Sequence, residues 1–103
     1  MSRIARPADL LAGLLRPAYG NNLVQIIDYT AQRRGVVAGI SCVAVIINSF
    51  EDLQAECEQL AEITMKIIEQ TGHCFSIFPI RAAELARPSY FARDILLKAP
   101  IIQ

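Results

Sequence analysis

Two apolar runs separated by a polar loop dominate the pattern of the chain. The second run, Ile40–Ile47, is interrupted only by Ser41, and such an unalternating β-branched run predicts a strand covered on both faces. The first run, Leu23–Thr30, contains Asp28 among its apolar residues, which predicts a strand with one less covered face. We expect any binding site in the connecting segment, Ala31–Gly39, because loops on a rigid scaffold carry binding groups.

Helical periodicity flanks these strands. An N-terminal helix is predicted to begin near Pro7 and to end at Arg16–Pro17. Asn48–Ser49 predicts the cap of a long helix, with Asp52 in the capping-box position and Gly72 at its end. The apolar residues of this helix recur at three- and four-residue steps and are Leu53, Cys57, Leu60, Ile63, Thr64, Ile67 and Ile68.

The last third of the chain predicts one more strand and two short helices. The strand is Cys74–Ile80, and Pro79 near its end is typical of an edge strand or a strand terminus. A helical turn is predicted within Arg81–Arg87 and a last helix within Ser89–Lys98. The apolar tail Ile101–Ile102 is expected to pack against the domain or pair with a strand.

This order of elements predicts one α+β domain over residues 1–103. The short connection between the first two strands favours an antiparallel pair, and the helix before the third strand favours a mixed sheet. Helices packed on that sheet give a two-layer arrangement.

Charge and composition narrow the class of protein. Ten basic and ten acidic residues cancel, which argues against nucleic-acid binding. Cys42, Cys57 and Cys74 have no metal-ligand spacing with His73, so they are expected to be reduced core residues of a cytoplasmic protein with no metal and no membrane span. Hydrophobic residues make up 53% of this small chain, which predicts apolar surface left for a partner.

The order of elements and several local phrases resemble the nucleotidyltransferase superfamily, in particular its minimal bacterial domains. Asp28–Gly35 stands where the family has a strand ending in a Gly-Ser turn and a basic loop. Gly39–Ile46 stands where a strand begins with Asp-x-Asp, Cys74–Ile80 matches the third strand, and Ser89–Ile102 matches the C-terminal tail. The resemblance implies a nucleotidyltransferase-like mixed sheet flanked by helices.

The family's catalytic residues are replaced in this chain. Thr30 and Ala31 align with the Gly-Ser turn, and Gly39 and Ser41 align with the two metal-binding aspartates. The third carboxylate falls near Ser76. Glycine and serine cannot replace two anionic ligands of Mg²⁺, since this hard cation requires carboxylate oxygens for two-metal chemistry.

A few residues remain as candidates for binding. Thr30, Arg33, Arg34 and Gly35 form a candidate phosphate or nucleotide site, because arginines offer forked donors and glycine allows close approach. A solvated loop explains the same residues. Asp28 is the fallback carboxylate, and an ordinary surface or ion-paired position is its alternative.

These residues support several functions. The first is a catalytically inactive nucleotidyltransferase-fold protein that acts as an interaction module, either as a homo-oligomer or as an antitoxin-like partner of a small helical protein of the HEPN type. The second is a divergent Mg²⁺-dependent enzyme that transfers NMP from an NTP such as ATP to a protein or small acceptor, using Asp28 with Glu51 or Asp52 as ligands. A third is a metal-independent nucleotide sensor that uses Arg33 and Arg34.

Overall fold

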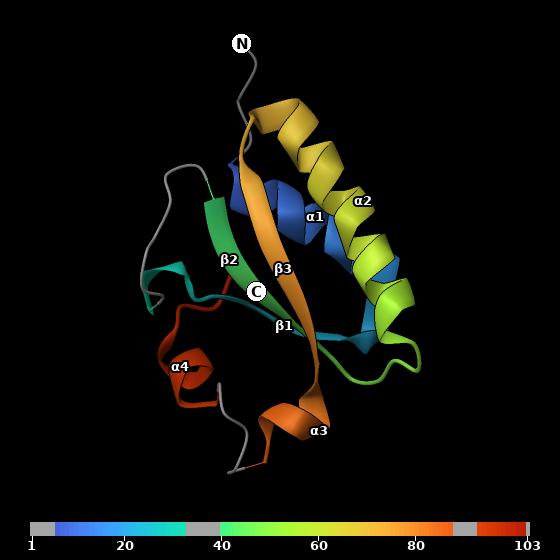
Figure 1. The fold of residues 1–103 in the computed structure, drawn as a ribbon, viewed down its shortest axis with the longest axis vertical. Helices are drawn as coiled ribbons and strands as arrows, with labels where there is room; N and C mark the ends of the chain where they lie inside the picture. Colours follow the sequence, from blue (N-terminus) through green and yellow to red (C-terminus); the bar gives the residue numbers. More distant parts are fainter. Residues whose placement is uncertain (1–5, 33–39, 88–92, 103) are drawn as a thin grey trace.

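The computed structural model describes residues 6–32, 40–87 and 93–102 (Figure 1). None of the described helices is both long enough and apolar enough to cross a bilayer. In chain order the elements are α1 (Pro7–Tyr19), the 3-10 turn η1 (Gly20–Asn22), β1 (Leu23–Asp28), the 3-10 turn η2 (Thr30–Gln32), β2 (Ile40–Ile47), α2 (Leu53–Thr71), β3 (Cys74–Arg81), α3 (Ala82–Leu85) and α4 (Arg93–Lys98).

The three strands form one mixed sheet in the order β1-β2-β3. β1 pairs with β2 antiparallel, and β3 pairs with β2 parallel. The predicted α+β class and the predicted antiparallel pair are therefore confirmed. β2 is the central strand, and its residues from Cys42 to Ile47 are buried, as its unbroken apolar run predicts.

The structure differs from the predicted two-layer arrangement, since helices pack on both faces of the sheet. Side chains alternate between the faces along each strand, so both faces carry apolar residues that need cover. α1 and α2 cover one face, and α3 and α4 cover part of the other (Figure 1). The buried residues of the first core are Leu11, Ala12, Leu15, Ile26, Val43, Val45, Ile47, Leu60, Ile63, Ile67 and Phe75. Those of the second core are Ile27, Ala44, Ile46, Ile80, Leu96 and Ala99.

α1 is longer than its sequence predicts. The expected end at Arg16–Pro17 is wrong, since the helix continues to Tyr19. The Tyr19 hydroxyl donates a hydrogen bond to a carboxylate oxygen of Glu56 on α2 at 2.7 Å, so a tertiary contact holds the last turn although Pro17 cannot donate the helical hydrogen bond. Burial and the neighbouring Glu56 carboxylate raise the pKa of Tyr19 well above its usual range.

α2 begins later than predicted. Asp52 is its N-cap, and its carboxylate accepts hydrogen bonds from two backbone N–H groups of the first turn, at 3.0 and 3.3 Å. The predicted cap at Asn48–Ser49 is wrong, because this segment bonds instead to Asn22 of η1 through the Ser49 backbone. The predicted end at Gly72 is confirmed, with φ of 74° at this glycine.

The C-terminal tail covers the outer edge of β1. Ile101 forms an antiparallel bridge with Ile27. The Asp28 N–H donates to the carbonyl of Pro100 at 3.0 Å, and the Ile102 N–H donates to the carbonyl of Ile26 at 2.8 Å. The expectation that the tail pairs with a strand is confirmed.

The cysteines differ in exposure although all were expected in the core. Cys42 is buried, Cys74 is half-buried and Cys57 is exposed, so the expectation is wrong for Cys57. α2 directs other residues of its apolar stripe into the core, and these are Leu60, Ile63 and Ile67.

Candidate functional site

The predicted site residues gather at one end of the sheet. The end of β1 lies beside the beginning of β2, since Asp28 pairs with Val43, and the beginning of β3 follows, since Ser76 pairs with Cys42. Thr30 and Ala31 belong to η2, directly after β1. The other candidates lie outside the described residues and are Arg33, Arg34, Gly35 and Gly39.

The hydroxyl of Thr30 joins β1 to β2. It donates a hydrogen bond to Oδ1 of Asp28 at 2.6 Å and accepts one from the Cys42 N–H at 2.8 Å. The same Asp28 oxygen accepts the backbone N–H of Thr30 at 3.0 Å. This arrangement is an Asx turn that starts η2, so both side chains have structural roles.

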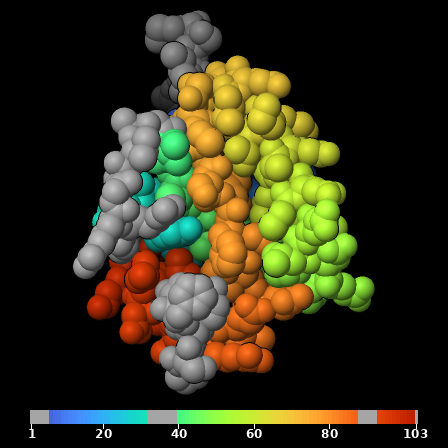
Figure 2. All heavy atoms as spheres, in the orientation of Figure 1, coloured from blue at the N-terminus to red at the C-terminus, as the bar shows by residue number. Residues whose placement is uncertain are grey.

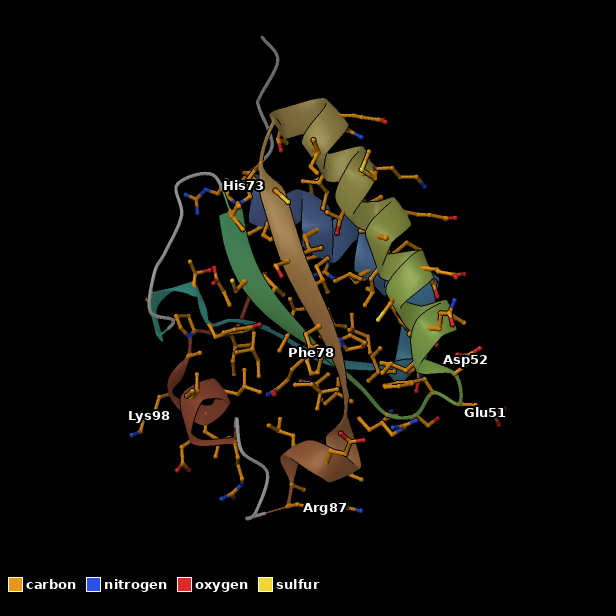
Figure 3. All side chains as sticks on the ribbon, viewed as in Figure 1. Glu51, Asp52, His73, Phe78, Arg87 and Lys98 are labelled. Atoms are coloured by element: carbon orange, nitrogen blue, oxygen red, sulfur yellow. The ribbon has the colours of Figure 1, made fainter. Side chains whose placement is uncertain are left out.

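Ser41 is hydrogen-bonded to the only histidine of the chain. Its Oγ lies 2.7 Å from Nε2 of His73. The backbone N–H of His73 donates to the hydroxyl of Thr71 at 3.1 Å, and its ring meets Phe75 edge-on with centroids 4.9 Å apart. The contact joins the start of β2 to the turn before β3, where Figure 3 shows His73.

Sequence reasoning did not find the Ser41–His73 pair. The two residues are 32 positions apart, and only the parallel pairing of β2 and β3 brings them together. A serine and a histidine in hydrogen-bond contact are also the first two members of a nucleophilic triad. His73 donates no hydrogen bond to a carboxylate among the described residues, so the third member of such a triad is missing there.

Ser41 and Ser76 do not share a face of the sheet. The register pairs Ser41 with Phe75 and pairs Cys42 with Ser76, and successive residues of a strand point to opposite faces. Phe75 belongs to the core under α1 and α2, so Ser41 lies on that face and the exposed Ser76 lies on the other. The two serines cannot contribute jointly to one cleft.

The other acidic candidates lie at the opposite end of the sheet. Glu51 and Asp52 follow the end of β2, and Figure 3 shows both at the N-terminus of α2, far from His73. Asp52 is occupied as the helix cap. Within residues 6–32, 40–87 and 93–102, no three His, Cys, Asp or Glu side chains gather in a way that could hold a metal ion.

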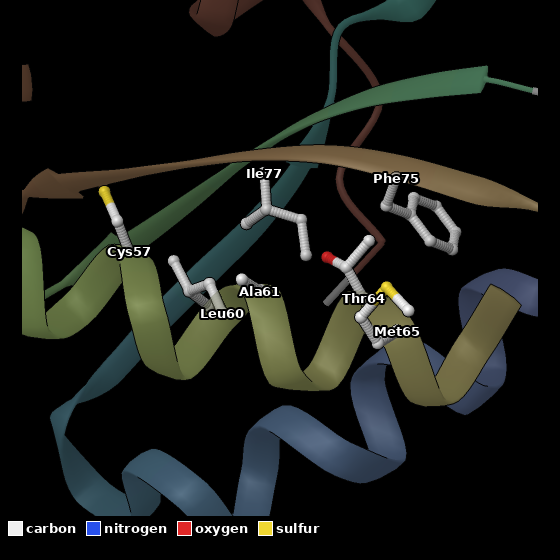
Figure 4. Close-up of a pocket in the computed structure, with 7 residues that line it drawn as sticks. All are labelled: Cys57, Leu60, Ala61, Thr64, Met65, Phe75 and Ile77. Carbon is white, nitrogen blue, oxygen red and sulfur yellow. The ribbon is translucent and has the colours of Figure 1, made fainter. Parts of the chain in front are cut away.

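An open apolar groove of about 270 Å³ runs between α2 and β3 (Figure 4). Phe75 and Ile77 project into it from β3. The residues that line it from α2 are Cys57, Leu60, Ala61, Thr64 and Met65. Among the described residues, no charged side chain lines this groove, so its walls suit an apolar partner surface.

A second groove of about 250 Å³ lies on the other face of the sheet, between β1, α3 and α4. Arg93 is the one charged residue among the described residues that line it, and Leu97 of α4 forms part of its wall with 60% of its surface exposed. A polar contact closes the nearby end of β3, where Arg81 bonds to the Phe50 carbonyl and to Glu84.

No protein-family model, no curated protein and no solved structure matches this chain.

Proposed function

We propose that this protein is a nucleotidyltransferase-like scaffold without nucleotidyl transfer, which acts in the cytoplasm by binding another protein. The resemblance in element order supports the scaffold, together with the meeting of the end of β1 with the first residues of β2 and β3. In that superfamily the same three positions supply the Gly-Ser turn and the carboxylates.

The proposed absence of catalysis depends on the hydrogen bonds that polar groups at this end of the sheet make within the fold. Oδ1 of Asp28 accepts two hydrogen bonds from Thr30, and the Thr30 hydroxyl is held by the Cys42 N–H. Ser41 is bonded to His73. Among the described residues, the candidate side chains at this end of the sheet are therefore hydrogen-bonded within the fold. The alternative acidic ligands, Glu51 and Asp52, lie at the other end.

Exposed apolar side chains support a role in protein binding. Small domains leave such residues exposed singly, but here Met65 lines the groove between α2 and β3, Phe78 lies on β3, and Val24 and Leu97 line the second groove. The large exposed hydrophobic residues of the described chain are Val24, Ile40, Leu53, Met65, Phe78, Ile95, Leu97 and Ile101. A small helical protein of the HEPN type is the partner that the resemblance favours, and an apolar helix face would suit the exposed residues.

Calorimetric titration with Mg-ATP tests the absence of catalysis. We expect no heat of binding, because Asp28 alone cannot hold the two metal ions that nucleotidyl transfer uses. Heat that requires Mg²⁺ and disappears in Asp28→Asn would overturn the proposal in favour of a divergent transferase. Heat that persists in a chelator and disappears in Arg34→Ala would instead indicate a nucleotide sensor.

An affinity-tagged chain expressed in its source organism tests the binding role. We expect a second protein to be retained in stoichiometric amount and to be retained equally by Asp28→Asn, which changes the sheet end and not the exposed apolar residues. Recovery of the tagged chain with no other polypeptide would contradict a role in binding another protein.

A further inference from the structure

The two edges of the sheet differ in how far other parts of the chain cover them. The outer edge of β1 is covered by the tail, which satisfies backbone groups of Ile26 and Asp28. β3 is the other edge strand, and no strand among the described residues pairs with its outer side. An eight-residue edge of this kind presents unpaired N–H and C=O groups to any added strand.

The open edge of β3 has few of the features, such as charged residues and prolines, that usually prevent an edge strand from pairing with another chain. Its only charged residue is Arg81 at the end, and that guanidinium is already bonded to Phe50 and Glu84. Pro79 is the one residue that interrupts the donors of the edge. Figure 2 shows β3 at the surface beside α2, and β3 is the last strand of the sheet in the described structure.

Uncharged side chains line both flanks of this edge. On the α2 side they recur every four residues, which places them in one stripe along the helix. The exposed members of this stripe are Leu53, Cys57, Ala61 and Met65, and Met65 is 54% exposed. On the opposite face of the sheet Phe78 is 47% exposed, and Figure 3 shows it near the middle of β3.

We propose that a second copy of this chain docks on this edge, with the two β3 strands antiparallel about a two-fold axis and the two α2 stripes packed beside each other. The assembly would join two three-stranded sheets into one. A strand edge is self-complementary under such an axis, because each outward N–H meets the C=O of the same strand in the second copy.

The position of Pro79 sets the register. Proline has no N–H, so it fits a paired strand when its nitrogen lies on the open side. Residues 75, 77 and 79 then direct their backbone groups outward. With Ile77 on the axis, Ile77 meets itself, and the Phe75 N–H donates to the Pro79 carbonyl of the second copy, so that only the Phe75 carbonyl lacks a donor.

The sizes of the residues on α2 suit the same axis. Ala61 and Ile77 line the same groove, so the axis passes close to Ala61. Its small side chain allows two helices to approach closely. Under an antiparallel arrangement Met65 lies opposite Cys57 of the second copy, which pairs a large side chain with a small one.

The area of this surface meets the need of a dimer. Eight residues of β3 extend about 26 Å, and the sheet with the α2 layer is about 20 Å deep. The footprint is about 500 Å² in each copy, on the order of 1,000 Å² in total, the size at which specific interfaces begin. A dimer of moderate affinity is therefore expected.

Sedimentation equilibrium from micromolar to millimolar protein tests the dimer. We expect a species of twice the 11.4 kDa chain mass at the upper concentrations. Ala61→Arg is expected to weaken dimerisation by about a hundredfold or more, because two cations would meet near the axis. Phe78→Lys should weaken it by about tenfold. Leu97→Lys, on the exposed face of α4, is the matched control and should leave it unchanged.

Cross-linking tests the position of the axis. In a Cys57→Ala background, Ala61→Cys should be joined to itself by a short bis-maleimide, whereas Leu97→Cys in the same background should not. A wild-type monomer at millimolar concentration would overturn the homodimer, and so would a dimer that persists in Ala61→Arg or cross-links at residue 97. A monomer that binds a different protein through residue 61 would assign the surface to that protein instead.

Dimerisation at β3 does not depend on nucleotide binding. An experiment that contradicts the dimer can therefore be told apart from one that contradicts the proposed function. Heat of binding on titration with Mg-ATP would contradict the proposed function but would not bear on the dimer. A monomeric chain that does not bind Mg-ATP would contradict the dimer but would leave the proposed function standing.

Discussion

At the scale of single residues, polar groups at the end of β1 are used to build the fold. The Thr30 hydroxyl acts as donor and acceptor at once, joining Asp28 to the Cys42 N–H of the central strand. The same two residues are the ones that the sequence suggests for phosphate or metal binding. A hydroxyl with two short internal hydrogen bonds is costly to redirect toward a ligand.

Thr30→Val tests this structural role. The substitution keeps the shape of the side chain and leaves the Cys42 N–H without its acceptor, so the free energy of unfolding should fall by about 1–3 kcal/mol. Urea denaturation gives this value. Thr30→Ser keeps the hydroxyl and is the matched control, with an expected loss under about 1 kcal/mol. Equal losses in the two variants would show that the hydroxyl contributes nothing.

At the scale of elements, the last turn of α1 depends on α2. Pro17 predicts the end of the helix, yet Tyr19 remains helical because its hydroxyl is bonded to Glu56. The phenol is stabilised in its protonated form, since burial and the Glu56 carboxylate both raise the pKa of Tyr19. A group whose pKa is raised in the folded state stabilises the fold fully below its ordinary pKa, and this contribution is lost as the pH rises toward the raised value.

Tyr19→Phe should therefore show a pH-dependent effect on stability. At about pH 8 the loss of one hydrogen bond should lower the free energy of unfolding by about 1 kcal/mol. Above about pH 10, the ordinary pKa of tyrosine, the difference between wild type and variant should shrink, because the unfolded wild type releases its phenolic proton and the folded one retains it. Urea denaturation at both pH values measures the difference. A constant difference would contradict the raised pKa of Tyr19.

At the scale of the whole molecule, one sheet edge is closed by the chain and the other is open. The tail ties the C-terminus to β1 through Pro100 and Ile102, and Ile102 packs against the first core. β3 has no such cover in the described structure. This asymmetry leaves a single edge for association and prevents open-ended stacking of sheets.

A chain ending at Ala99 tests the contribution of the tail. Two backbone hydrogen bonds and the half-buried Ile102 side chain are removed, so the free energy of unfolding should fall by about 2–4 kcal/mol. The exposed outer edge of β1 should also promote association at high concentration. Ile101→Ser is the control. The Ile101 side chain is largely exposed, so the free energy of unfolding should change by about 0.5 kcal/mol at most. A truncated chain as stable as wild type would contradict a structural role for the tail.

Much of this fold follows from local pattern. The apolar run of Ile40–Ile47, interrupted only by Ser41, determines a central strand, since only a strand covered on both faces buries six successive residues such as Cys42–Ile47. Gly72 ends α2 because the left-handed backbone there suits glycine. Pro79 marks β3 as an edge strand. These features depend on near neighbours in the chain, so they are readable without the structure.

The candidate site and the exposed stripe were decided by tertiary structure. Ser41 and His73 meet only through the pairing of β2 with β3, and Ser41 and Ser76 are separated by the register of the same strands. The apolar stripe of α2 predicts one buried face, yet Cys57 remains exposed because it lines the open groove between α2 and β3. Periodicity identifies apolar residues, but which of them meet another layer depends on where the layers end.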